Sequence, residues 1–156
     1  MVKHWLSQEE SIKYLSKAFY GHLATTNDHQ PYIVPVNFVY YQNHIYIHSS
    51  LNGQKLENIK NNSRVCFEVS HFTKLLPGNK PCQFGVCYWS VLVFGQAKIL
   101  DNMNLKTKAL HLLIKKYCQN EYLPLLDPEN IQQVAIIDIN IERISGKANI
   151  ENKVEE

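Results

Sequence analysis

One segment of the sequence carries the side chains of an anion site. Residues 48–55 read His-Ser-Ser-Leu-Asn-Gly-Gln-Lys, which predicts a strand ending in hydroxyls and a helix that begins near Lys55. Backbone N–H groups at a helix start bind phosphate oxygens, Ser49 and Ser50 add hydroxyl donors, and Lys55 supplies a positive charge. An ordinary turn, with Gly53 at positive φ and Lys55 in solvent, fits the same spacing.

A second candidate lies on the predicted strand from Tyr32 to Tyr41. Proline cannot donate to a β-ladder, so this strand should be interrupted, or lie at an edge, near Pro35. The unpaired N–H and C=O groups of such an edge, around Val36, Asn37 and Phe38, could meet the polar rim of a planar ring. A bulged edge strand that faces solvent fits these residues equally well.

Other kinds of site find little support in the sequence. There is no G-x-x-x-x-G-K-[ST] and no G-x-G-x-x-G for a nucleotide, and no G-x-S-x-G for a nucleophilic serine. His44 and His48 fall on one predicted strand about 13 Å apart, at roughly 3.3 Å per residue, which is too far to share a zinc ion. We therefore expect no metal site.

The elements that must position these segments are mainly strands. A capping box of Ser7 and Glu10 predicts an amphipathic helix that ends at Gly21. Turns at Asn27–Asp28 and Gln42–Asn43 predict two successive hairpins, a meander. The predicted strands are His22–Thr26, Tyr32–Tyr41, His44–His48, Arg64–Val69, Phe84–Leu100 with bends at Gly85 and Gly95, and a last strand around Ile137–Glu142; Leu75–Gln83 is predicted as a loop. Six strands with three helices indicate a mainly β protein, a small barrel with peripheral helices.

Two of these elements have a clear apolar face. In the last strand Ile137, Ile139 and Ile141 alternate with polar residues, which predicts one buried face and one wet face. A short helix is predicted at Gln54–Asn61, and a second amphipathic helix at about Asn104–Tyr117. In the second of them the apolar side holds Leu105, Ala109, Leu112 and Leu113, and the lysines 106, 108, 115 and 116 lie elsewhere around it.

Size and composition favour one domain. The chain has 156 residues, 45% hydrophobic and 19% charged, and we expect residues 1–148 to form the domain and 149–156 a polar tail. A net charge of +2, with the basic residues spread along the chain, does not favour nucleic-acid binding. No signal peptide or membrane span is evident, so we expect a cytoplasmic protein whose four cysteines remain thiols.

The order of several segments resembles one known family. The segments are GHLATT (21–26), PYIVPVNFVY (31–40), IYIHSSLNGQKLENI (45–59), RVCFEV (64–69), YWSVLVFGQAKIL (88–100) and ISGKA (144–148). In this order they resemble the pyridoxamine 5'-phosphate oxidase-like split-barrel family, in its nitroimidazole-resistance branch. The resemblance covers about Gly21 to Ala148.

The resemblance implies a six-stranded split β-barrel homodimer that holds FMN, in some members FAD, at the subunit interface. It places the phosphate near His48, Ser49 and Lys55, and makes His48 the catalytic histidine of the reductases. Further cofactor-binding positions are implied at Pro35, Val36, Asn37 and Phe38, with Tyr88 and Ser90 reaching the cofactor near the dimer interface. One departure is Trp89, which stands where many relatives carry arginine.

The implied activity is that of a flavin-dependent oxidoreductase. Electrons from NAD(P)H would pass to a small nitro- or quinone-type acceptor, and the protein would set the geometry and electrostatics of the cofactor. His48 could relay a proton, because histidine changes charge near neutral pH. Two alternatives remain: a flavin store or sensor without turnover, and a haem protein with His48, His71 or His111 as axial ligand.

Overall fold

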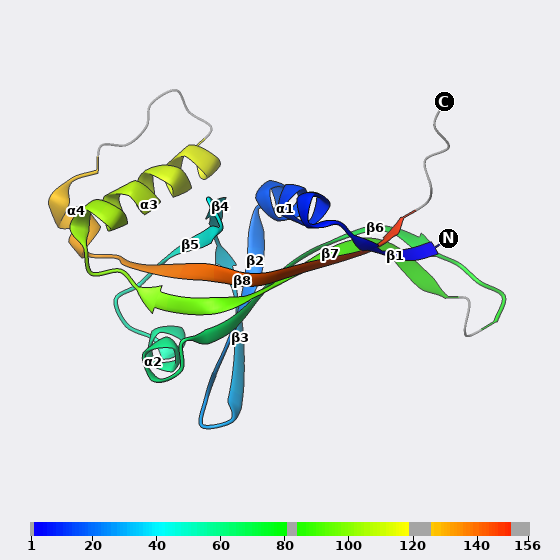
Figure 1. Cartoon of the computed structure of the whole chain (residues 1–156), viewed down its shortest axis with the longest axis horizontal. Helices are drawn as coiled ribbons and strands as arrows, with labels where there is room; N and C mark the ends of the chain where they lie inside the picture. Colours follow the sequence, from blue (N-terminus) through cyan, green and yellow to red (C-terminus); the bar gives the residue numbers. More distant parts are fainter. Residues whose placement is uncertain (1, 81–83, 119–125, 151–156) are drawn as a thin grey trace.

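Alternating apolar residues along most of the chain build one antiparallel sheet, with helices against its faces, as the computed structural model shows for residues 2–80, 84–118 and 126–150 (Figure 1). The elements are β1 (Val2–Leu6), α1 (Gln8–Lys17), β2 (Tyr20–Asn27), β3 (Gln30–Asn37), β4 (Val39–Tyr41), β5 (His44–Ser49), α2 (Gln54–Asn61), β6 (Arg64–Leu76), β7 (Gly85–Ile99), α3 (Met103–Tyr117), α4 (Pro128–Gln132) and β8 (Ala135–Ile150). The predicted mainly β class is confirmed.

The described sheet has eight strands where the sequence predicted six. Its order is β3-β2-β6-β7-β8-β5-β4, and β1 pairs with β8 beside this path. The short strand β1 was not predicted, and the predicted strand Tyr32–Tyr41 is two strands, because the chain leaves the ladder at Phe38. A fourth helix, α4, was also missed; it is only five residues long, with Pro128 in its first turn.

The two hairpins form, but they are not a meander. Asp28 and His29, and likewise Gln42 and Asn43, have positive φ, which a two-residue hairpin turn of the I′ type requires. The first turn lies one residue beyond its predicted position, and the second lies where it was predicted. The hairpin β2–β3 ends at one side of the sheet and β4–β5 at the other, while β3 and β5 are again in contact. The sheet therefore curves back on itself and leaves a split between the two hairpins.

Two strands are much longer than the sequence predicted. β6 continues past Val69 to Leu76, into the predicted loop, and β8 runs from Ala135 to Ile150. The ladder between β7 and β8 shifts register between Phe94 and Gly95, which confirms a bend at that glycine. The outer ends of β6 and β7 project as an arm beside β1 (Figure 1).

The main core fills the concave side of the sheet. Ile137, Ile139 and Ile141 of β8 belong to it, as predicted. The opposite face of β8 is not wholly wet, however: Ile136 belongs to a second cluster with Ala109 and Leu113 of α3, and Asp138 is buried. α3 covers Ile136, and Asp138 lies between His44 of β5 and Lys98 of β7, so the prediction of a wet face was wrong at Asp138.

α1 and α3 differ from their predicted faces in detail. The capping box of α1 is present, with Glu10 N–H donating to Ser7 Oγ and Ser7 N–H to the Glu10 carboxylate. α1 ends at Lys17, before the predicted end at Gly21, and Phe19 beyond it is exposed. In α3 the predicted apolar residue Leu105 is exposed and Lys106 is buried.

The end of β8 reaches into the segment predicted as a tail. Asn149 is buried, and its side-chain amide donates to the carbonyl of Val86. Cys66 is a free thiol. Cys82 and the tail from residue 151 onward lie outside the described residues. No described helix is both long enough and apolar enough to cross a membrane.

Candidate functional site

A pocket of about 550 Å³ opens at the split between the two hairpins. It brings together both segments that the sequence singled out, although β2, β6, β7 and β8 lie between β3 and β5 in the strand order of the sheet. Its lining residues are Tyr20, Val34, Pro35, Val36, Asn37, His48, Ser49, Ser50 and Lys55. Six predicted cofactor-binding positions, Pro35, Val36, Asn37, His48, Ser49 and Lys55, are therefore on one wall or the other.

The β3 wall presents the edge of its strand to the pocket. Four consecutive residues, 34–37, line it, whereas side chains that alternate between faces would supply every second one. β3 pairs with β2 and with no other described strand, so its outer backbone groups are open to a ligand, as predicted. Pro35 stays within the ladder, opposite His22, and the interruption predicted near it comes three residues later.

A tyrosine from α3 holds the chain where β3 ends. The hydroxyl of Tyr117 accepts from Phe38 N–H at 2.9 Å and contacts the carbonyl oxygens of Phe38 and Phe19. Burial raises the pKa of Tyr117, against the effect of its bond to Phe38. Tyr117 thus takes the place of a neighbouring strand at Phe38 and fixes the end of the β3 wall.

Phe38 itself faces away from the pocket. Its ring is fully buried in the main core, edge-on to Phe67 at 4.7 Å between centroids. The ammonium of Lys116 lies 3.8 Å from the centre of the Phe38 ring and donates to the carbonyl of Ala18. Burial lowers the pKa of Lys116 to about 8. Phe38 therefore supports the β3 wall from behind.

The opposite wall joins the end of β5 to the start of α2. Ser49 is buried, and its hydroxyl oxygen has no hydrogen-bond partner among the described residues. Ser50 donates to the carbonyl of Asn52, so its hydroxyl serves the turn. Gly53 is the N-cap residue at φ 138° and has no side chain to cap the helix, which leaves the first N–H groups of α2 for other acceptors. Gly53 therefore has the positive φ that an ordinary turn predicts, and the same segment also presents the donors that an anion site predicts.

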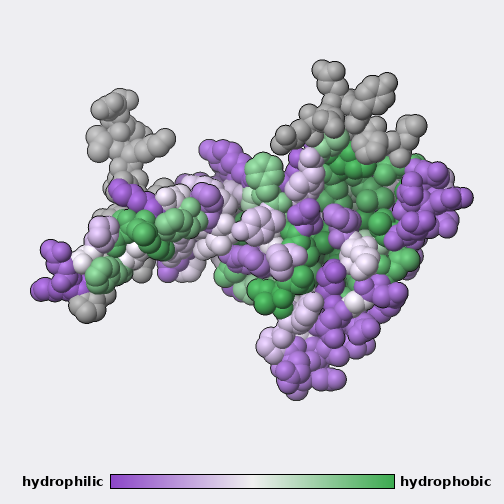
Figure 2. All heavy atoms as spheres, turned by 180° about the vertical axis from the view of Figure 1, so that it is seen from behind, coloured by the Kyte–Doolittle hydropathy of each residue, from purple (hydrophilic) through white to green (hydrophobic). Residues whose placement is uncertain are grey.

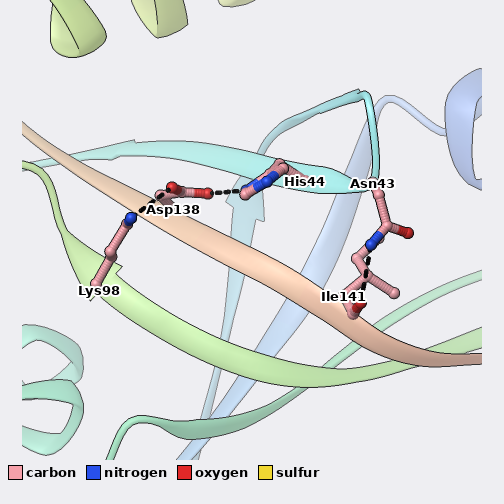
Figure 3. Close-up of polar contacts among 5 residues, drawn as sticks. All are labelled: Asn43, His44, Lys98, Asp138 and Ile141. Carbon is pink, nitrogen blue, oxygen red and sulfur yellow. Dashed lines mark hydrogen bonds and ion pairs between the residues drawn. The ribbon is translucent and has the colours of Figure 1, made fainter.

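His48 and His44 point to different environments. His48 is exposed and lines the pocket. His44 Nδ1 lies 2.6 Å from Asp138 Oδ1, and Lys98 Nζ lies 3.6 Å from the other oxygen of this carboxylate (Figure 3). No group of three or more metal-ligating side chains occurs in the part of the chain that the structure describes.

The two predicted positions on β7, Tyr88 and Ser90, do not line this pocket in a single chain. They pair with Phe72 and Ser70 of β6 along the projecting arm. Between them, Trp89 stacks on Tyr14 of α1 at 4.7 Å and lies against His71 at 5.9 Å between ring centroids. In this chain Trp89 therefore packs α1 onto the sheet. The roles of Tyr88 and Ser90 stay predictions.

Tyr20 and Val34 are pocket residues that the sequence reasoning missed. Tyr20 is directly opposite Asn37 in the β2–β3 ladder. A two-residue turn at Asp28–His29 fixes this register, since each step away from the turn pairs one residue of β2 with one of β3. Counting back from the turn would have found Tyr20, had the turn been placed correctly.

The comparisons with known proteins agree on one family. The family described as pyridoxamine 5'-phosphate oxidase matches residues 7–148. A proposed 5-nitroimidazole antibiotic resistance protein from Bacteroides thetaiotaomicron superimposes with a TM-score of 0.80 at 21% identity, over 95% of this chain and 89% of that one. An FAD-binding protein from Mesorhizobium loti superimposes with a TM-score of 0.73 at 27% identity, over 96% of this chain and 100% of that one. The FAD and heme binding protein from Mycobacterium smegmatis superimposes with a TM-score of 0.85 at 16% identity, over 96% of this chain and 74% of that one.

A curated relative matches over a shorter stretch. An uncharacterized protein from Rhizobium meliloti is 31% identical over 67 residues, which are 43% of this chain and 44% of that protein. The match thus spans less than half the length of that relative. The structural likenesses agree with the predicted split-barrel fold.

Proposed function

The chain belongs to the pyridoxamine 5'-phosphate oxidase family, and from that premise we propose that it is a flavin-dependent oxidoreductase. Its cofactor would be FMN or FAD, its electron donor NAD(P)H, and its acceptor a small nitro- or quinone-type compound. The observation that carries the proposal is the pocket in which an open strand edge faces an uncapped helix start with Ser49 and Lys55. The solved relatives described as FAD-binding support the same cofactor class.

The α2 side of the pocket suits the phosphate of a flavin. Ser49 Oγ is a buried polar atom without a partner among the described residues, and such atoms usually find one. Lys55 lines the same wall, and the described residues offer it no carboxylate. A phosphate bound by Ser49, Lys55 and the first N–H groups of α2 would satisfy all three donors at once.

The β3 side suits the planar ring system. The open edge of residues 34–37 would offer N–H and C=O groups to the ring's polar rim, while Tyr117 keeps the end of this wall in place. Bound flavin would supply the hydride and electron transfer itself. His48, exposed on the pocket wall, would hold or move a proton for the acceptor.

We further propose that two copies of the chain form the working unit in the cytoplasm. Large apolar side chains are exposed on the projecting arm and on β1, where Figure 2 shows apolar surface: Trp5, Phe72, Leu75, Phe84, Val86 and Leu92. A second copy would cover this surface. It could also bring Tyr88 and Ser90 of one chain to the pocket of the other. Light scattering after gel filtration should give twice the 18.1 kDa of the chain.

The visible spectrum of the protein purified without added cofactor tests the proposal. We expect flavin bands and about one flavin per chain, then reoxidation by a nitro or quinone acceptor during NAD(P)H consumption, faster than with free flavin. His48→Ala should keep the flavin and lower turnover. Bound flavin without acceptor-dependent turnover would instead support a store or sensor. A colourless protein that binds neither FMN nor FAD but gives a Soret band with haem would contradict the flavin proposal.

A further inference from the structure

Helix α3 has a lysine on its buried face, at a position where the helical period predicts an apolar residue. The buried residues of α3 are Lys106, Ala109 and Leu113, spaced three and four apart as on one helix face. Leu105, one position earlier, is 49% exposed, whereas Lys106 is 9% exposed. Rotating α3 by one residue would bury the leucine and release the lysine. Local rules of this kind are most often broken at functional positions.

Among the described residues, Lys106 also has no partner of opposite charge. No hydrogen bond or ion pair joins the side-chain ammonium of Lys106 to any residue within the described ranges 2–80, 84–118 and 126–150. A lysine is rarely covered to this extent without an acidic partner. Lys116, at the other end of α3, shows the usual solution, since its ammonium donates to the carbonyl of Ala18.

Lys106 lines a second pocket, where β7 enters α3. Its volume is about 490 Å³, and it has no lining residue in common with the pocket at the split. Leu56, Ile59 and Leu100 give it an apolar wall. α2 separates the two pockets, because Lys55 faces the split and the next turns of the helix face this pocket.

The charges around this second pocket favour an anion. Lys60 and Lys98 line it together with Lys106, and Asp101 is the carboxylate on its wall. Lys98 lies 3.6 Å from Asp138, which leaves Lys60 and Lys106 without an acidic partner among the described residues. Pockets that combine apolar walls with a few placed charges are typical of small-molecule sites.

From this geometry we propose that the second pocket binds a small organic anion. Its carboxylate or phosphate head group pairs with Lys106 and Lys60, and its apolar body packs on Leu56, Ile59 and Leu100. The ligand supplies the partner that the buried lysine lacks. This site is independent of the proposed flavin pocket, so its occupation needs neither flavin nor turnover.

Calorimetric titration of the purified protein with octanoate and with octyl phosphate tests the site. Octanol, which has the same chain without a charge, shows what the apolar wall binds alone. We expect one of the two anions, or both, to bind at one per chain and at least tenfold more tightly than octanol. The anion that binds more tightly identifies the head group.

Three variants assign the binding to this pocket. Lys106→Met keeps the aliphatic stem and should weaken anion binding at least tenfold. Lys60→Met, at an exposed position that does not endanger folding, should weaken it severalfold. Lys115→Met removes the same charge from an exposed position of α3 and should leave binding unchanged. Each variant should keep its bound flavin, which separates this test from that of the proposed function.

Thermal unfolding gives a second measurement. A ligand that binds only the folded state raises the melting temperature, so octanoate should stabilise the wild type and the Lys115→Met variant more than Lys106→Met. The proposal is overturned if neither anion binds more tightly than octanol. It is equally overturned if Lys106→Met and Lys60→Met bind the anions as the wild type does.

Discussion

The two pockets on either side of α2 are built in different ways. The pocket at the split takes its donors from local features: the end of β5, the uncapped start of α2 and the edge of β3. The pocket under α3 takes its charge from Lys106, which only the packing of α3 on the sheet makes a buried residue. A site made of local features leaves a motif in the sequence. A site that depends on tertiary packing appears in the sequence only as a residue that does not fit the local hydrophobic pattern.

Because both pockets depend on one sheet, a defect in the sheet should affect both. In Gly95→Ala the new Cβ would lie 2.1 Å from the carbonyl oxygen of Asn140, a backbone atom that cannot move aside easily. We expect a loss of about 3 kcal/mol or more in the free energy of unfolding, measured by chemical denaturation. Gly85→Ala is the control, since its Cβ would meet only Leu76 Cδ1, at 3.8 Å. Equal stability of the two variants would contradict this account of the sheet.

A narrower change should separate the pockets. Tyr117→Phe removes the hydroxyl that accepts from Phe38 N–H and contacts two carbonyl oxygens. We expect about 2 kcal/mol of lost stability, because these backbone groups lose a partner, and weaker flavin binding by titration. Octanoate binding should not change. Tyr32→Phe, on an exposed residue of β3, is the control; if it matched Tyr117→Phe in flavin affinity, Tyr117 would not hold the β3 wall.

What the sequence could predict follows the same division. Ser7 with Glu10, the turn at Gln42–Asn43 and the helix at Gln54–Asn61 depend on contacts between near neighbours, and each forms where it was predicted. The segment around Ser49 and the β3 edge at residues 34–37 were found for the same reason.

The errors concern partners that are distant in the chain. Nothing local shows that the two hairpins end on opposite sides of the sheet, because β6, β7 and β8 come between them only in space. The buried Asp138 contacts His44 of β5 and Lys98 of β7, which are both distant from it in the sequence. The rotation of α3 that buries Lys106 and exposes Leu105 is likewise set by packing on the sheet.

The smallest expected effect compares Lys116 with the exposed Lys115 of α3 over a range of pH. Burial lowers the pKa of Lys116 from its ordinary value of 10.5 to about 8. Between these values the unfolded chain holds more protons than the folded one, so this lysine makes stability rise with pH above about 8; below that, its contribution is constant. The stability of the wild type minus that of Lys116→Met, from chemical denaturation at pH 7 to 10, should rise over this range. A flat difference, as expected for the exposed Lys115→Met, would contradict the effect of burial on Lys116.

Flavin titration of Lys55→Met and of Lys60→Met tests whether the cofactor binds in the pocket at the split. Both lysines lie on α2, but Lys55 lines the pocket at the split and Lys60 the second pocket. The account predicts that FMN or FAD binds the wild type and Lys60→Met equally, at about one per chain, and binds Lys55→Met at least tenfold more weakly, as the loss of one charge-assisted hydrogen bond implies. Equal flavin affinity in all three proteins, or weaker binding only in Lys60→Met, would contradict it.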